Sequence, residues 1–129
     1  MKGNQMRTPM SRVRGLGAAH TGTHHFWHQR VTSVAAIPLT IAAIIIVISL
    51  LGRSHAAVGQ IIGSPIVAII MLLFIINTVY HMWIGMQEIV IDYVHEDKLK
   101  LATLLGNTFF CFAIGFASAF AILKLSFGV

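Results

Sequence analysis

Hydrophobic and polar positions divide the chain into three long apolar runs separated by short polar segments. The runs cover residues 31–51, 65–87 and 101–123, and none of them contains Lys, Arg, Asp or Glu. A helix needs about 20 apolar residues to cross the hydrocarbon core of a bilayer, and each run reaches that length. The pattern therefore predicts three transmembrane helices with little chain left over for a soluble module.

The composition agrees with a membrane protein. Of the 129 residues, 57% are hydrophobic and only 10% are charged, and the mean hydropathy is +0.82. A soluble domain of this size could not bury so much apolar surface. We predict an all-α integral membrane protein with three transmembrane helices in one domain, 1–129. Its parts are an N-terminal segment, 1–29, and the helices 30–51, 65–92 and 101–124.

The net charge is +5, and the basic residues are distributed unevenly between the two sides of the membrane. This distribution gives no sign of nucleic-acid binding. One side of the membrane carries seven basic residues: Lys2, Arg7, Arg12, Arg14, Arg30, Lys98 and Lys100. The other side carries only Arg53 and Lys124. The positive-inside rule then places the N-terminus and the second loop in the cytoplasm. We expect a multi-pass protein of the bacterial inner membrane, and prefer this to the mitochondrial inner membrane. Residues 1–29 are expected to be retained, because they show neither a cleavage site nor an apolar helical face.

His81 is the strongest candidate for a functional site. It lies deep in the second apolar run, where an imidazole is costly unless something occupies it. It could be an axial haem ligand, a proton relay or a histidine bonded to a neighbouring helix. Gly85 follows at i+4 on the same face, where a missing side chain would let a flat macrocycle lie close. There is no C-x-x-C-H sequence, so any haem would be bound non-covalently.

Polar side chains near the membrane edges form a second group of candidates. Asp92 follows His81 by eleven residues, which is about 1100°, or three turns plus about 20°, so the two share one helix face about 16 Å apart. Asp92 and Tyr93 could be a polar helix end, or a carboxylate and a phenol that serve a quinone. Glu88 could lie on a proton path or simply reach water. Arg30 could snorkel to lipid phosphates or pair with a haem propionate.

These residues together resemble a known family. His81-x3-Gly85-x6-Asp92-Tyr93 on the second of three helices is similar to the smaller cytochrome b anchor subunit of succinate dehydrogenase, complex II. The segment Phe26-Trp27-His28-Gln29-Arg30-Val31-Thr32-Ser33 resembles that family's approach to its first helix. The resemblance covers about residues 15–125. Some relatives carry an acid where this chain has His25.

The resemblance implies a set of roles and partners. His81 would be one axial ligand of haem b, with the second ligand coming from another anchor chain, and Arg30 would contact a haem propionate. Tyr93 would hydrogen-bond ubiquinone, with Asp92 beside it in the site. The implied partners are a flavoprotein, an iron–sulfur protein, a second cytochrome b anchor and membrane lipid. The chain would not be an enzyme alone but a subunit of succinate:ubiquinone oxidoreductase.

Three alternatives remain open from the sequence. A fumarate reductase anchor would use the same residues with the chemistry reversed. A small proton-coupled transporter would use Glu88 as its titrating carboxylate, although inverted repeats or a carboxylate nearer the middle of a helix would then be expected. A purely structural assembly protein would leave His81 unexplained.

Overall fold

Three long helices dominate the structure, a computed structural model that describes residue 10 and residues 20–128, with side chains from 24 onward. In chain order the helices of residues 20–128 are α2 (His20–Leu50), α3 (His55–Ile62), α4 (Pro65–Tyr93) and α5 (Asp97–Phe127). The three long ones, α2, α4 and α5, are each long and apolar enough to cross a membrane. The predicted all-α class with three candidate transmembrane helices is therefore confirmed.

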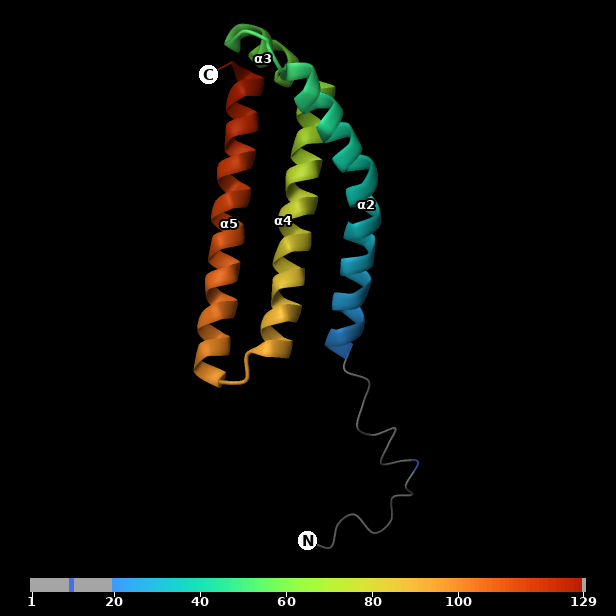
Figure 1. Cartoon of the computed structure of the whole chain (residues 1–129), viewed down its shortest axis with the longest axis vertical. Helices are drawn as coiled ribbons and strands as arrows, with labels where there is room; N and C mark the ends of the chain where they lie inside the picture. The colour runs from blue at the N-terminus through green and yellow to red at the C-terminus, as the bar shows by residue number, and fades with distance from the viewer. Residues whose placement is uncertain (1–9, 11–19, 129) are drawn as a thin grey trace, which may run out of the picture.

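The helix α4 lies between the other two long helices and packs against both (Figure 1). The start of α2 and the connection between α4 and α5 lie at one end of the bundle. The short helix α3 and the end of α5 lie at the other end. His81 therefore belongs to the central helix of the three.

Local sequence explains where the helices begin and end. Ser64 is the N-cap of α4 and Pro65 its first residue, a position where proline loses no helical hydrogen bond. Asp97 lies in the first turn of α5, where a carboxylate is favoured by the helix dipole. Gly128 caps the end of α5 with φ 69°, a left-handed conformation that favours glycine.

The helices of the structure extend beyond the predicted transmembrane segments, and one helix was not predicted. The helix α5 runs over Asp97–Phe127, where the predicted segment is 101–124. The helix α2 begins at His20, inside the segment that the sequence pattern separated from the first transmembrane helix. The helix α3 lies in what was taken as a loop, and Ser54 caps it by accepting a hydrogen bond from the backbone N–H of Ala57. Pro38 lies within α2, which curves along its length in Figure 1, as expected for a helix interrupted by proline.

Little of the described chain is buried within itself. The buried side chains are Thr32, Ala43, Ile62, Ala68, Ile84, Val90, Cys111 and Ile122. Many large apolar side chains on all three long helices are exposed, among them Ile37, Ile69 and Phe116. Such a surface suits lipid or other transmembrane helices rather than water. Thr32 is the only polar side chain in the buried set of the described residues, and it contacts His81.

Candidate functional site

His81 is held against α2 by one of its two ring nitrogens. Its Nδ1 lies 2.8 Å from the hydroxyl oxygen of Thr32, whose side chain is only 8% exposed. Among the described residues, the other ring nitrogen, Nε2, makes no hydrogen bond, and it is not one of the buried polar atoms left without a partner. Within the described residues the imidazole is thus hydrogen-bonded at one nitrogen only.

Three further contacts fix Thr32 itself. Its hydroxyl lies 2.8 Å from the carbonyl oxygen of His28 and 3.1 Å from that of Gln29, both in the preceding turn of α2. The side-chain amide of Asn77, one turn before His81 on α4, donates to the carbonyl oxygen of Thr32 at 3.1 Å. The two helices are therefore joined at this level by two side-chain hydrogen bonds, from His81 and from Asn77 of α4 to Thr32 of α2.

Polar contacts between α2 and α4 continue from His81 toward the start of α2. The hydroxyl of Tyr80 lies 2.6 Å from Nδ1 of His28. Closer to the end of the bundle, Nδ1 of His25 lies 3.7 Å from a carboxylate oxygen of Glu88, with both side chains partly open to solvent. Glu88 therefore lies at an open edge beside a histidine. An acid at position 25 would face this carboxylate with like charge.

Gly85 has a different neighbour from the one expected. A Cβ atom at this position would lie 3.4 Å from the side-chain nitrogen of Gln29 on α2. A Cβ atom there would make an ordinary van der Waals contact, so Gln29 does not require the glycine. The face of Gly85 that was expected to be open to a macrocycle is, however, lined by this side chain of α2. The carbonyl oxygen of the Gln29 side chain is buried without a hydrogen-bond partner among the described residues.

Asp92 and Tyr93 are the last two residues of α4, and both are exposed. Tyr93 is 78% exposed, so its phenol is free to meet a molecule or subunit outside this chain. Arg30 is also exposed, and its guanidinium lies over the ring of Phe26 at 5.3 Å. Because residues 30 and 32 are about 200° apart on a helix, Arg30 points away from the Thr32–His81 contact.

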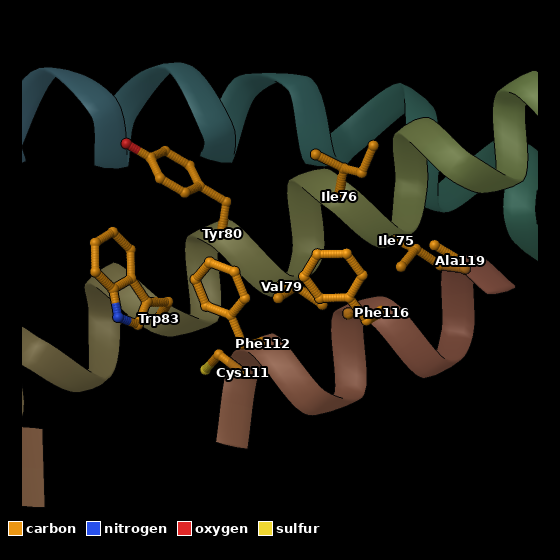
Figure 2. A pocket seen from close by; sticks show the side chains of 10 residues that line it. Ile75, Ile76, Val79, Tyr80, Trp83, Cys111, Phe112, Phe116 and Ala119 are labelled. Atoms are coloured by element: carbon orange, nitrogen blue, oxygen red, sulfur yellow. The ribbon is translucent and has the colours of Figure 1, made fainter. Parts of the chain in front are cut away.

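The opposite side of α4 packs on α5 through a second set of polar contacts. The indole nitrogen of Trp83 donates to the hydroxyl of Thr108 at 3.1 Å, and the side-chain amide of Asn107 donates to the carbonyl oxygen of Trp83 at 3.1 Å. Beside them an apolar groove of about 490 Å³ runs between α4 and α5. Figure 2 shows Tyr80, Trp83, Phe112 and Phe116 around it. Its surface is almost wholly apolar, although Tyr80, Trp83 and Cys111 belong to the lining.

The structure brings His81 together with residues that the sequence pattern did not single out. Thr32 and Asn77 are ordinary residues of apolar runs, and only the packing of α2 on α4 joins them to His81. His81, Asp92 and Arg30 are not in contact with one another. Within residues 24–128, no group of three or more His, Cys, Asp or Glu side chains could hold a metal ion by itself.

Comparisons with known proteins identify the family. The succinate dehydrogenase/fumarate reductase transmembrane subunit family matches residues 4–115. A succinate dehydrogenase hydrophobic membrane anchor subunit from Paracoccus denitrificans is 31% identical over 94% of this chain and 93% of its own length. The subunit of the same name from Rickettsia bellii is 29% identical over 81% of this chain and 83% of its own length. No solved structure gave a significant match.

The three apolar helices and the family match together define the class of protein as a multi-pass membrane anchor. The chain belongs to the succinate dehydrogenase/fumarate reductase transmembrane subunit family, among the membrane anchor subunits of succinate dehydrogenase, complex II.

Proposed function

We propose that this chain supplies one axial ligand of haem b and part of a ubiquinone site in a membrane-bound succinate dehydrogenase. The observation that carries the proposal is the state of His81, a histidine inside a candidate membrane-spanning helix whose Nδ1 contacts Thr32 and whose Nε2 has no partner among the described residues. Metal-bound histidines characteristically bond their second ring nitrogen to a neighbouring group. In a chain of this family, this arrangement favours the interpretation of His81 as a haem ligand over that of a purely structural residue.

The residues of this chain fit a shared haem better than one enclosed by the chain alone. His81 lies on a helix whose outer surface is largely unburied, so a macrocycle would lie between this chain and the second anchor. The second anchor would provide the other axial ligand, and Arg30 would contact a propionate. When bound, the haem supplies one-electron redox chemistry, and the axial ligand influences its potential.

The quinone part of the proposal rests on the exposed end of α4. Tyr93 would donate a hydrogen bond from its phenol to a quinone carbonyl, and the carboxylate of Asp92 would exchange protons with the adjacent water. Both side chains are exposed in this chain, as a site completed by other subunits requires. Their position at the helix end gives protons a short route from the aqueous phase.

The partners and orientation follow from the same assignment. A flavoprotein and an iron–sulfur protein would dock at the end of the bundle that carries Tyr93, which the charge distribution assigns to the cytoplasm. The chain would anchor them in the bacterial respiratory membrane and would not be catalytic alone. The same residues would serve fumarate reduction, because the direction depends on cofactors in other chains. The transporter alternative gains no support, since Glu88 lies at an open edge.

A reduced-minus-oxidised visible spectrum of the purified complex tests the proposal. The complex should show the absorption of a low-spin b-type haem, together with succinate–quinone activity. A complex that contains this chain and oxidises succinate without any haem signal would remove His81 from its proposed role.

A further inference from the structure

We propose that Thr32 is a positioning residue for the haem ligand. Its hydroxyl oxygen accepts a hydrogen bond from the Nδ1–H of His81, and this bond fixes both the ring orientation and the tautomer that leaves Nε2 free for iron. The inference rests on the proposed function and adds a residue from α2 to a site otherwise assigned to α4. Three observations carry it.

The first observation is the number of acceptors around the Thr32 hydroxyl. A hydroxyl has one hydrogen to donate and two lone pairs that accept. Two backbone carbonyl oxygens of the preceding turn, those of His28 and Gln29, lie 2.8 and 3.1 Å away and both accept only. The hydroxyl hydrogen therefore points at the backbone, and a lone pair faces His81. The nitrogen of His81 at 2.8 Å must then be the one that carries the hydrogen.

The second observation is that the same arrangement recurs on the other side of α4. The hydroxyl of Thr108 donates to the carbonyl oxygen of Leu104 at 2.9 Å and lies 3.1 Å from the indole nitrogen of Trp83. An indole N–H can only donate, so the direction of this bond is certain. A threonine that bonds back to its own helix thus serves here as an acceptor for a ring N–H on α4. Thr32 stands in the same relation to His81.

The third observation is that Thr32 is confined. Its side chain is 8% exposed, and its carbonyl oxygen accepts a hydrogen bond from Asn77 on the helix that carries His81. The hydroxyl is therefore held at a fixed place relative to the imidazole, and a water molecule cannot easily replace it. An acceptor that bonds the other ring nitrogen of a metal-bound histidine fixes its orientation and raises its basicity.

The expected consequence is electronic as well as steric. An imidazole that donates from Nδ1 gives more electron density to iron through Nε2, which stabilises the oxidised haem. Loss of the acceptor should raise the midpoint potential of the haem. Replacing the group that bonds a metal-bound histidine typically changes metal affinity about tenfold or more. A tenfold change in the ratio of oxidised to reduced haem corresponds to about 59 mV for a one-electron couple.

The test uses the intact complex with Thr32→Val, which keeps the branched shape and removes the hydroxyl. Thr32→Ser restores a hydroxyl, and Ser33→Ala is the matched control. Ser33 is the next residue of α2, and its hydroxyl donates to the carbonyl oxygen of Gln29 at 2.7 Å without touching His81. Haem content, haem midpoint potential and the electron paramagnetic resonance g values of the oxidised haem are measured for each.

Thr32→Val should raise the midpoint potential and shift the g values, while Thr32→Ser and Ser33→Ala should stay at the wild-type values. Full haem content with unchanged potential and g values in Thr32→Val would overturn the role of Thr32 while leaving the haem assignment of His81 intact. If Thr32→Val does not assemble, Thr32→Cys offers a poorer acceptor and should shift the potential in the same direction, so an unchanged value there would equally overturn it. A wild-type complex without haem would instead overturn the proposed function.

Discussion

Val79 of α4 fits against Gly115 of α5 so closely that there is little room for a side chain between them. A Cβ atom at Gly115 would lie 3.3 Å from Cγ1 of Val79, which is tighter than an ordinary contact. At Gly106, in the same helix, a Cβ atom would meet nothing within 4 Å. Of these two small residues of α5, Gly115 is therefore the one that allows α4 and α5 to approach.

This difference predicts the effect of two matched substitutions. Gly115→Leu should lower the free energy of unfolding by about 1–3 kcal/mol relative to Gly106→Leu, because it forces α4 and α5 apart. Both changes replace a glycine inside the same helix, so the gain in helix propensity is shared. Thermal unfolding of the purified complexes, followed by circular dichroism, measures the difference. Equal stability of the two variants would mean that the Val79–Gly115 contact does not determine the packing.

The sequence was sufficient for the three long helices because uncharged runs of this length have few alternatives in a bilayer. It was not sufficient for α3, whose eight residues are too short to stand out from a loop. Ser54 before an apolar stretch was the available signal for its start. The early start of α2 at His20 was missed because glycines and histidines hide the beginning of the helix.

For the candidate site, the sequence could single out His81 but not its partner Thr32. Helical periodicity relates residues on one helix, and it says nothing of how two helices are rotated against each other. The contact between Thr32 and His81 depends on that rotation, as does the position of Gln29 against Gly85. The assignments of Asp92, Tyr93 and Arg30 stay predictions, since other chains would have to complete their sites.

The orientation in the membrane can be tested with two exposed histidines at opposite ends of the bundle. His95 lies in the connection between α4 and α5, and His55 begins α3. With single cysteines at these positions, a membrane-impermeant maleimide should label His95→Cys only from the cytoplasmic side and His55→Cys only from the other. Cys111 is buried inside α5 and serves as the unlabelled background. Labelling in the opposite sense would invert the proposed orientation.

Tyr93→Phe tests the quinone site because it removes one hydroxyl and keeps the ring. Loss of the hydrogen bond to a quinone carbonyl should slow succinate–quinone turnover about tenfold or more, as expected for a bond worth about 1.4 kcal/mol or more in the reaction. Haem content and succinate oxidation by an artificial acceptor should stay near wild type. Wild-type quinone turnover in this variant would show that the Tyr93 hydroxyl does not bind quinone and that Tyr93 is only the last residue of α4.

A shared haem also predicts how the chain behaves without its partner. Expressed alone, the chain should retain little haem, because His81 is the only histidine placed deep within a membrane-spanning helix among the described residues. Coexpression with the second anchor subunit should restore a six-coordinate haem. The haem content per chain, measured from the visible spectrum of the purified material, decides the matter. A stable six-coordinate haem in the lone chain would require both ligands from this sequence.

The most direct measurement of the central claim is the reduced-minus-oxidised visible spectrum of the complex with His81→Ala, compared with His55→Ala as the matched control. His55 is exposed at the far end of the bundle and has no part in the proposed site. The account predicts that His81→Ala loses the low-spin haem signal or most of the haem, while His55→Ala keeps the wild-type spectrum. A full, unchanged low-spin spectrum in His81→Ala would contradict the assignment of His81 as a haem ligand.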